Sequence, residues 1–152
     1  MNLSEILSVD RIKCHSAVDS KKVALEELAQ LLASAEKSFA YMDIFNCLIN
    51  REKLGSTGLG SGVAIPHGRQ NNCDKTYGAF LKLHNGIDFD AIDQKPVDLI
   101  FALLVPEDST DEHLQVLAQL AEKFSHEKLL KDLRSTDDTE TIFNILTRDV
   151  NV

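Results

Sequence analysis

The residues with the clearest chemical potential lie in a glycine-rich run, residues 58–69, which ends in a single histidine inside a Pro-His-Gly triplet. Gly58, Gly60 and Gly62 allow backbone N–H groups to approach an anion closely. The neutral imidazole of His67 is a good nucleophile toward phosphorus, and a phosphohistidine can pass its phosphoryl group onward. The run therefore predicts a phosphoryl-accepting histidine, displayed on a turn.

Phosphate-binding residue types precede this run. Arg51 has a planar fork that can hold two phosphoryl oxygens, and the hydroxyls of Ser56 and Thr57 can donate to a third. Residues 63–65 are apolar and predict a short buried strand that fixes the end of the loop. The expected phosphate-binding residues, apart from Arg51, are Ser56, Thr57, Gly58, Gly60 and Gly62.

Two helices are predicted before the glycine-rich run. Residues 21–32 have apolar side chains at helical spacing, and Ser20 is suited to cap them. Residues 41–49 show the same periodicity and would deliver Arg51 at the carboxyl end of a helix. Gly55 follows as the expected break, which lets Arg51 leave the helix to meet phosphate.

Strands and further helices are predicted after the run. The pattern of residues 76–84 predicts a strand with one apolar face, formed by Tyr77, Ala79, Leu81 and Leu83. Residues 98–105 are almost all apolar, so we expect a central strand that is buried on both faces and ends at Pro106. Residues 138–147 close the chain with an amphipathic helix. Helices interleaved with buried strands predict an α/β sandwich, and we expect a single domain over residues 1–152.

A second histidine of interest, His113, lies in a predicted helix over residues 111–124. It shares a stripe with Leu117, Leu120 and Phe124, so it should face inward near the start of the helix, where residues 109–112 have capping-box spacing. An inward histidine is more often a satisfied core residue than a functional one. The reactive loop around His67 favours the functional interpretation here.

The remaining histidines and the cysteines suggest no chemistry. His15, His84 and His126 lack comparable neighbours in the sequence and are interpreted as surface or edge residues. The three cysteines, Cys14, Cys47 and Cys73, show no CxxC spacing, and their odd number indicates free thiols in a reducing cytoplasm. A chain of 152 residues buries enough surface to need no disulfide or metal.

Composition excludes several classes of function. The net charge of −8, from 24 acidic and 16 basic residues, disfavours binding to nucleic acid or to an anionic membrane. The amino terminus has no signal-peptide pattern, and no apolar run is long enough for membrane insertion, so a cytoplasmic protein with protein partners is expected. Asp90, Asp93 and Asp98 match no calcium loop, and we expect no metal and no cofactor.

Two blocks of sequence resemble a known family. Residues 48–69 contain REKLGSTGLGSGVAIPHGR, and residues 89–106, followed by His113 and Leu114, form the second block. Both resemble the mannitol/fructose-type enzyme IIA domains of the bacterial phosphotransferase system. The resemblance covers nearly the whole chain and is strongest to the nitrogen-regulatory branch, whose members stand alone at about this length.

The resemblance implies roles for particular residues. His67 matches the phosphorylated histidine, His113 the second active-site histidine, and Arg51 the arginine of the same site. It implies a three-layer sandwich in which a mixed β-sheet has helices on both faces and the histidine pocket at one edge. It also implies a phosphorylated HPr-like donor (NPr) and regulated targets such as potassium-transport or sensor proteins.

Three alternatives remain open from the sequence. A sugar-uptake enzyme IIA that passes phosphate to an enzyme IIB would carry the same reacting residues. A regulatory binding protein would keep the phosphate and change its partners instead. A nucleotide-binding module is disfavoured, because Gly58, Gly60 and Gly62 lack the GxGxxG spacing and no GK[ST] motif is present.

Overall fold

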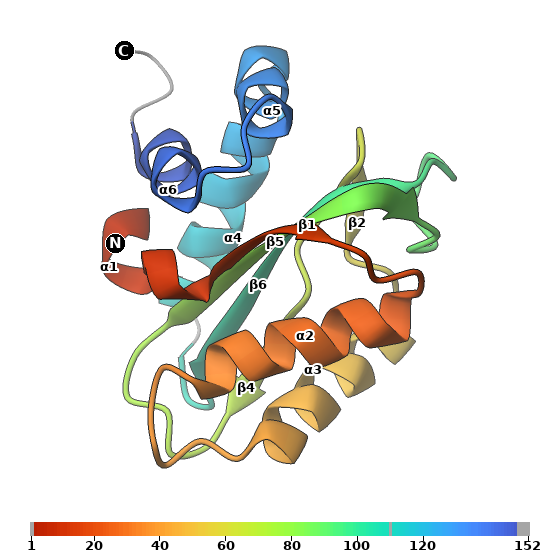
Figure 1. Cartoon of the computed structure of the whole chain (residues 1–152). Helices are drawn as coiled ribbons and strands as arrows, with labels where there is room; N and C mark the ends of the chain where they lie inside the picture. Colours follow the sequence, from red (N-terminus) through yellow and green to blue (C-terminus); the bar gives the residue numbers. More distant parts are fainter. Residues whose placement is uncertain (1, 110, 149–152) are drawn as a thin grey trace.

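The computed structural model describes residues 2–109 and 111–148, in an arrangement of one sheet between two groups of helices (Figure 1). The elements in chain order are α1 (Leu3–Ile6), a short 3-10 helix (Val9–Arg11), β1 (Ile12–Ser16), α2 (Lys21–Ala33), α3 (Tyr41–Leu54), β2 (Gly58–Gly60), β3 (Val63–Ala64), β4 (His67–Gln70), β5 (Tyr77–Ile87), β6 (Val97–Pro106), α4 (Asp111–Phe124), α5 (Glu127–Arg134) and α6 (Thr139–Thr147).

The six strands form one mixed sheet in the order β1-β5-β6-β3-β2, with β4 also paired to β6. β5 runs antiparallel to β6, whereas β3 and β4 both run parallel to it. β3 pairs with the first half of β6, through Val63 opposite Leu99, and β4 pairs with the second half, through His67 opposite Leu103. The two short strands thus follow one edge of β6 and are separated only by Ile65 and Pro66.

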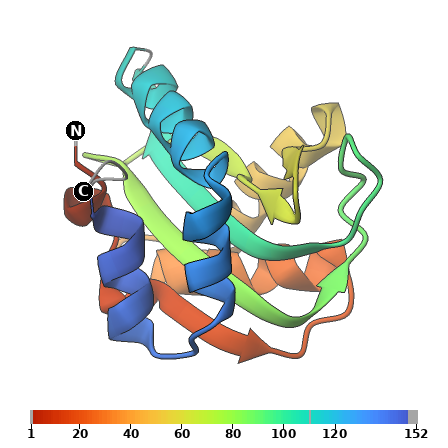
Figure 2. The same cartoon turned by 90° about the horizontal axis from the view of Figure 1, so that it is seen from above.

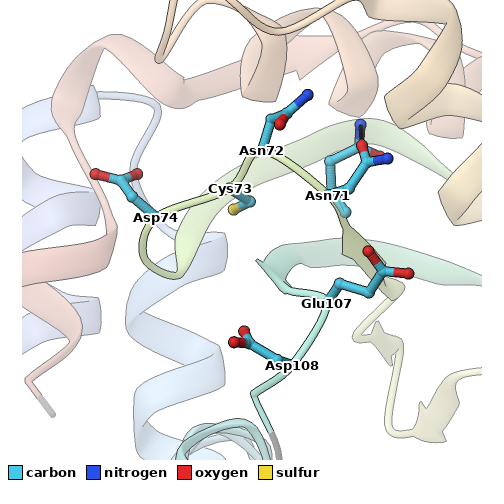
Figure 3. A pocket seen from close by; sticks show the side chains of 7 residues that line it. Asn71, Asn72, Cys73, Asp74, Glu107 and Asp108 are labelled. Carbon is cyan, nitrogen blue, oxygen red and sulfur yellow. Dashed lines mark hydrogen bonds between the residues drawn. The ribbon is translucent and has the colours of Figure 1, made fainter.

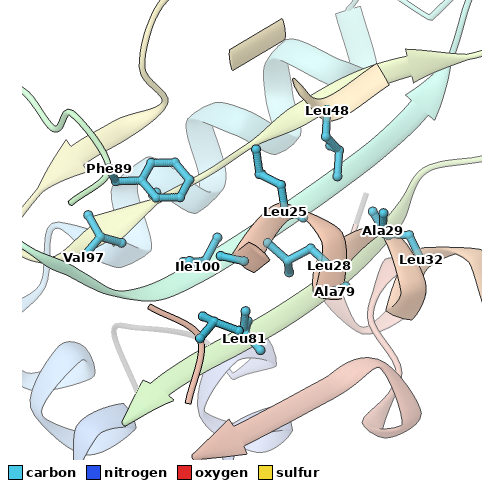
Figure 4. Close-up of a cluster of buried hydrophobic side chains, with 14 of the residues drawn as sticks. Leu25, Leu28, Ala29, Leu32, Leu48, Ala79, Leu81, Phe89, Val97 and Ile100 are labelled. Atoms are coloured by element: carbon cyan, nitrogen blue, oxygen red, sulfur yellow. The ribbon is translucent and has the colours of Figure 1, made fainter. Parts of the chain in front are cut away.

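Each face of the sheet has its own core. α2 and α3 cover one face, and α4, α5 and α6 cover the other, together with α1 (Figures 1 and 2). Because successive side chains of a strand point to opposite faces, β6 supplies Ile100 to the first core and Phe101 to the second, and both are fully buried. Figure 4 shows Leu25, Leu28 and Leu48 against the sheet in the first core. The predicted three-layer sandwich is confirmed.

Several local predictions are also confirmed. The hydroxyl of Ser20 accepts a hydrogen bond from the N–H of Val23 and caps α2. β6 is buried along nearly its whole length and ends at Pro106. α6 begins after Asp138, whose carboxylate accepts from the N–H of Thr141. The capping box predicted for residues 109–112 involves Thr110 and the side chain of Glu112, which lie outside the described part of the chain.

Other predictions need correction. His67 is the first residue of β4 and does not sit on a turn, because the chain resumes pairing with β6 directly after the extended Ile65-Pro66 step. β5 is buried on both faces rather than one, since Phe80 and Lys82 are buried as well. β1 and α5 were not predicted; both are short, so few periods of their pattern are present to detect.

No helix in the described ranges is both long and apolar enough to cross a bilayer.

Candidate functional site

Three of the predicted residues come together from three different elements. His67 opens β4, His113 lies in the first turn of α4, and Arg51 lies in the last turn of α3. The imidazole rings of His67 and His113 have their centroids 5.2 Å apart and are tilted by 51°. His67 and Arg51 line a pocket of about 390 Å³, and the positive charge of Arg51 acts on both histidines. The fold thus gathers two imidazoles and a guanidinium separated by up to 62 positions in the sequence.

The backbone before β4 sets the orientation of His67. Nδ1 of its ring lies 2.8 Å from the carbonyl oxygen of Ile65. This carbonyl is available because Ile65 lies in the gap between β3 and β4, where the pairing with β6 is interrupted. A carbonyl can only accept, so in the neutral ring Nδ1 carries the proton and Nε2 carries the lone pair. Nε2 is therefore the ring nitrogen of His67 that is free to act as a nucleophile.

His113 is buried, with 7% of its surface exposed, as the predicted stripe required. It is nevertheless not a satisfied core histidine: Nδ1 is buried and makes no hydrogen bond to any residue that the structure describes. An unpaired buried polar atom of this kind costs about 1–3 kcal/mol. It persists at sites where a ligand can supply the missing partner.

Arg51 remains within α3, which continues one turn beyond the predicted end and stops at Gly55. The side chain folds back, and Nη1 donates to the carbonyl oxygen of Gly55 at 2.9 Å. Among the described residues no carboxylate forms an ion pair with this guanidinium. Its remaining N–H groups can therefore bind an anion in the pocket.

Ser56 and Thr57 line the pocket, but both hydroxyl groups already donate hydrogen bonds to other residues of the protein. The hydroxyl of Ser56 donates to the carbonyl of Phe89 at 2.7 Å and accepts from the N–H of Gly58. The hydroxyl and the N–H of Thr57 both donate to the carboxylate of Glu52, at 2.5 and 2.8 Å. These groups form the wall of the pocket and do not point free donors into it.

Gly60 and Gly62 lie away from the histidines. They have positive φ angles of 99° and 81° on either side of Ser61, where the chain turns from β2 into β3. This turn is held by Asp93, which accepts from the N–H of Ser61, and by Arg134, which donates to the Ser61 carbonyl. Gly58 alone of the three glycines lines the histidine pocket.

The rest of the pocket is apolar, with walls formed by Leu59, Ile65, Leu117, Ala118 and Ala121. A larger hollow of about 730 Å³ lies at the ends of β4 and β6. Figure 3 shows the carboxylates of Asp74, Glu107 and Asp108 around it. Because three carboxylates would repel a phosphoryl group, the smaller pocket is the better candidate for binding one.

Burial lowers the pKa of both His67 and His113. For His67, burial is the largest cause, Arg51 lowers the pKa further, and the Ile65 carbonyl and Glu52 partly oppose the shift. For His113, burial is again the largest cause, followed by the charges of His67, Arg69 and Arg51. Both rings are therefore neutral at pH 7, which is the form that a nucleophile requires.

We expect this shift to appear as a pH dependence. Only neutral His67 can attack phosphorus, so phosphoryl acceptance should persist as the pH falls through the ordinary histidine value of 6.5 and decline only at lower pH. A titration of His67 and His113 by NMR, with N-acetylhistidine amide as the reference, should give midpoints below that of the reference. A midpoint at or above the reference for His67 would contradict the neutral nucleophile.

Two groupings were missed at the sequence level. The buried carboxylate of Glu52 and the partly exposed ammonium of Lys21 form an ion pair at 2.9 Å behind the pocket. Its only signal in the sequence is a lysine in the first turn of a helix, where a cation is unfavourable. His15 and His84 are exposed, as predicted, but their Nδ1 atoms lie 3.2 Å apart and His15 also contacts Asp137. No pattern in the sequence predicts this pairing of His15 with His84.

Comparison with known proteins identifies the family. Residues 5–149 match the family described as "Phosphoenolpyruvate-dependent sugar phosphotransferase system, EIIA 2". The chain belongs to this EIIA family. Its members are components of a phosphotransferase system, so proteins that donate and accept phosphoryl groups are its partners. The resemblance stated from the sequence is confirmed.

Within the EIIA family, the chain is similar to nitrogen-regulatory proteins. It is 42% identical to the nitrogen regulatory protein of Pseudomonas aeruginosa, over 96% of this chain and 95% of that protein. The crystal structure of nitrogen regulatory protein IIA-Ntr from Neisseria meningitidis superposes with a TM-score of 0.90 at 47% identity, covering 95% of this chain and 99% of that one. A fructose-specific EIIA component of Haloferax volcanii is 32% identical over 95% of this chain and 94% of its own length.

Proposed function

We propose that this EIIA protein is a phosphocarrier of a nitrogen-related phosphotransferase system, which accepts a phosphoryl group on Nε2 of His67 from a phosphohistidine donor of the HPr-like (NPr) type. The observation that carries the proposal is the bond between His67 Nδ1 and the Ile65 carbonyl, because it leaves the Nε2 lone pair facing a pocket that also holds Arg51. His113, with its unpartnered Nδ1, stands beside the same ring.

The transfer step follows from this geometry. Nε2 of His67 attacks phosphorus as the N–P bond of the donor breaks, and the donor imidazole leaves with the electron pair of that bond. The proton on Nδ1 of His67 stays in place. As the ring acquires positive charge, the Ile65 carbonyl stabilises it through the 2.8 Å hydrogen bond.

Arg51 and His113 are the groups assigned to stabilise the transferring phosphoryl oxygens. Arg51 can offer N–H donors from the pocket wall, and His113, whose ring lies beside that of His67, can donate through a ring nitrogen. The apolar part of the wall lowers the local polarity, which strengthens such interactions. Ser56, Thr57 and Gly58 shape the pocket. Gly60 and Gly62, from the phosphate-binding set expected from sequence, are assigned to the β2–β3 turn instead.

Regulation of protein partners is the proposed output. A phosphoryl group adds a charge of about −1.5 to −2 at a site that is otherwise positive through Arg51, and this changes which surfaces can dock over it. The greater identity to nitrogen-regulatory proteins than to the fructose-specific component favours this role over sugar uptake. Transfer to an enzyme IIB of the mannitol or fructose type is the second candidate.

The proposed function is tested by intact mass measurement under conditions that preserve acid-labile phosphate. The protein is incubated with phosphoenolpyruvate and the general phosphotransferase proteins of either the sugar or the nitrogen branch, and a gain of one phosphoryl group is expected. Addition of an enzyme IIB and its sugar should leave this phosphate in place. Loss of the phosphate to enzyme IIB would favour the sugar-uptake alternative, and no gain with any donor would overturn the phosphocarrier role.

We expect His113→Ala to slow phosphoryl transfer by about 10²-fold while the protein still accepts one phosphoryl group, because His113 stabilises charge and does not form the bond. Rapid-quench kinetics on wild type and variant at equal folded concentration measures this. If the variant instead melts at a much lower temperature and transfers at the wild-type rate, His113 is a structural residue.

A further inference from the structure

A buried carboxylate lies directly behind the pocket. The side chain of Glu52 in α3 is only 2% exposed; it accepts two hydrogen bonds, from the N–H and the hydroxyl of Thr57, and forms an ion pair with the ammonium of Lys21. Burying a charge is costly unless it is paired and hydrogen-bonded, and Glu52 has both kinds of partner. Nothing in the transfer step described above uses this group.

Lys21 occupies a position in its helix that its carboxylate partners, chiefly Glu52, explain. It is the first residue of α2, at the positive end of the helix dipole, where a cation is disfavoured. Its ammonium nevertheless lies 2.9 Å from the Glu52 carboxylate, 3.3 Å from the Phe89 carbonyl and 4.8 Å from the centroid of the Phe89 ring, and it forms a longer ion pair, at 3.5 Å, with the exposed carboxylate of Asp90. Lys21 therefore fixes Glu52 in place from a second helix.

Glu52 is linked to the nucleophile by a continuous chain of hydrogen bonds. Glu52 holds both donors of Thr57; the carbonyl of Thr57 accepts from the N–H of Ile65 at 3.1 Å; and the carbonyl of Ile65 accepts from Nδ1 of His67. Each bond holds one group of a residue whose carbonyl makes the next bond. The position of the Ile65 carbonyl, which decides the tautomer of His67, thus depends on Glu52.

We propose that Glu52, locked by Lys21, is the positioning residue of the phosphoryl-acceptor site: through Thr57 and Ile65 it holds His67 with Nδ1 protonated and Nε2 free to attack. This inference rests on the proposed function of His67. It assigns to Glu52 no contact with the phosphoryl group, and it assigns to Lys21 the role of holding Glu52.

The test combines transfer kinetics with NMR of the His67 ring nitrogens. Glu52→Gln leaves one acceptor oxygen where there were two, and Lys21→Met removes the ion pair at similar side-chain length. Both should lower kcat for phosphoryl acceptance by about ten-fold, because small displacements of a nucleophile are costly, while KM for the donor protein changes less than about two-fold. The nitrogen chemical shifts of His67 should show a mixture of tautomers in Glu52→Gln and one tautomer in wild type.

Matched variants separate positioning from stability. Lys21→Arg keeps the charge and should recover most of the wild-type kcat. Lys13→Met removes a lysine–glutamate ion pair, Lys13 with Glu27 at 3.2 Å, that is not part of the chain to His67 and should leave kcat unchanged. If Glu52→Gln does not fold, the comparison of kcat between Lys21→Met and Lys21→Arg still tests whether the ion pair with Glu52 is needed.

Two results would overturn the proposal: wild-type kcat in Lys21→Met and Glu52→Gln per folded molecule, or a single unchanged His67 tautomer in both. If wild type itself accepts no phosphoryl group, the proposed function fails. In that case the tautomer measurement still decides whether Glu52 positions His67.

Discussion

His67→Ala should abolish phosphoryl acceptance, with a loss of at least about 10³-fold, in a protein that remains folded. The reason is that Nε2 of His67 is the proposed acceptor atom, and no other described ring has its protonation fixed by a backbone carbonyl inside the pocket. Removal of the half-buried ring loses one hydrogen bond, so the free energy of unfolding should fall by only about 1 kcal/mol. Intact mass after incubation with the phosphorylated donor, together with thermal unfolding, measures both effects.

His126→Ala is the matched control. It removes an imidazole whose described side-chain partner is the exposed carboxylate of Glu122, four residues earlier in the chain. This variant should gain one phosphoryl group at the wild-type rate. If His67→Ala still became labelled on a histidine, the acceptor would be a different ring, and His113 would be the first to examine by peptide mapping.

The second large effect concerns the glycine after the nucleophile. A Cβ on Gly68 would lie 2.2 Å from Sγ of Cys47 and 3.2 Å from its carbonyl oxygen, because β4 packs directly on α3. Gly68→Ala should therefore push β4 away from α3 and lower the free energy of unfolding by about 1–3 kcal/mol. Since His67 precedes Gly68 on the same strand, phosphoryl acceptance should fall as well. Chemical denaturation and transfer kinetics measure the two losses.

Two further variants make this prediction specific. Gly55→Ala adds the same methyl group where nothing lies within 4 Å and the backbone is extended, so stability should change by no more than about 0.5 kcal/mol. Cys47→Ala removes the sulfur that Gly68→Ala would meet, so the double variant should be more stable than the sum of the two single effects. Strict additivity would show that the contact between β4 and α3 is not the cause.

The fold could be predicted wherever a pattern was long. β6 was recognisable because its apolar run is unbroken, and α2, α4 and α6 because each shows helical periodicity over several turns. β1 was missed: it is short, and its pattern is broken at a bulge, where His15 has a positive φ of 57°. No periodicity exists over so few residues.

The candidate site was predicted as a set of residues but not as an arrangement. Residue types together with the family resemblance selected His67, His113 and Arg51, and the structure brings them together. Residue types could not show that the hydroxyls of Ser56 and Thr57 are committed to Phe89 and Glu52, because these bonds depend on contacts between separate elements. The buried position of Glu52 could not be predicted either, since an acidic residue between Arg51 and Lys53 is typical of an exposed, charged surface.

The attachment of β4 to β6 also has a consequence for how the protein responds to heat. His67 does not belong to a loop that can open independently; its strand is bonded along β6, the fully buried middle of the sheet. The amide protons of residues 68–70 that point toward β6 should exchange with solvent at rates set by global unfolding rather than by local opening. On heating, the capacity to accept phosphate should then be lost in the same cooperative transition as the fold. Local unfolding of β4 alone should not provide a way to inactivate His67.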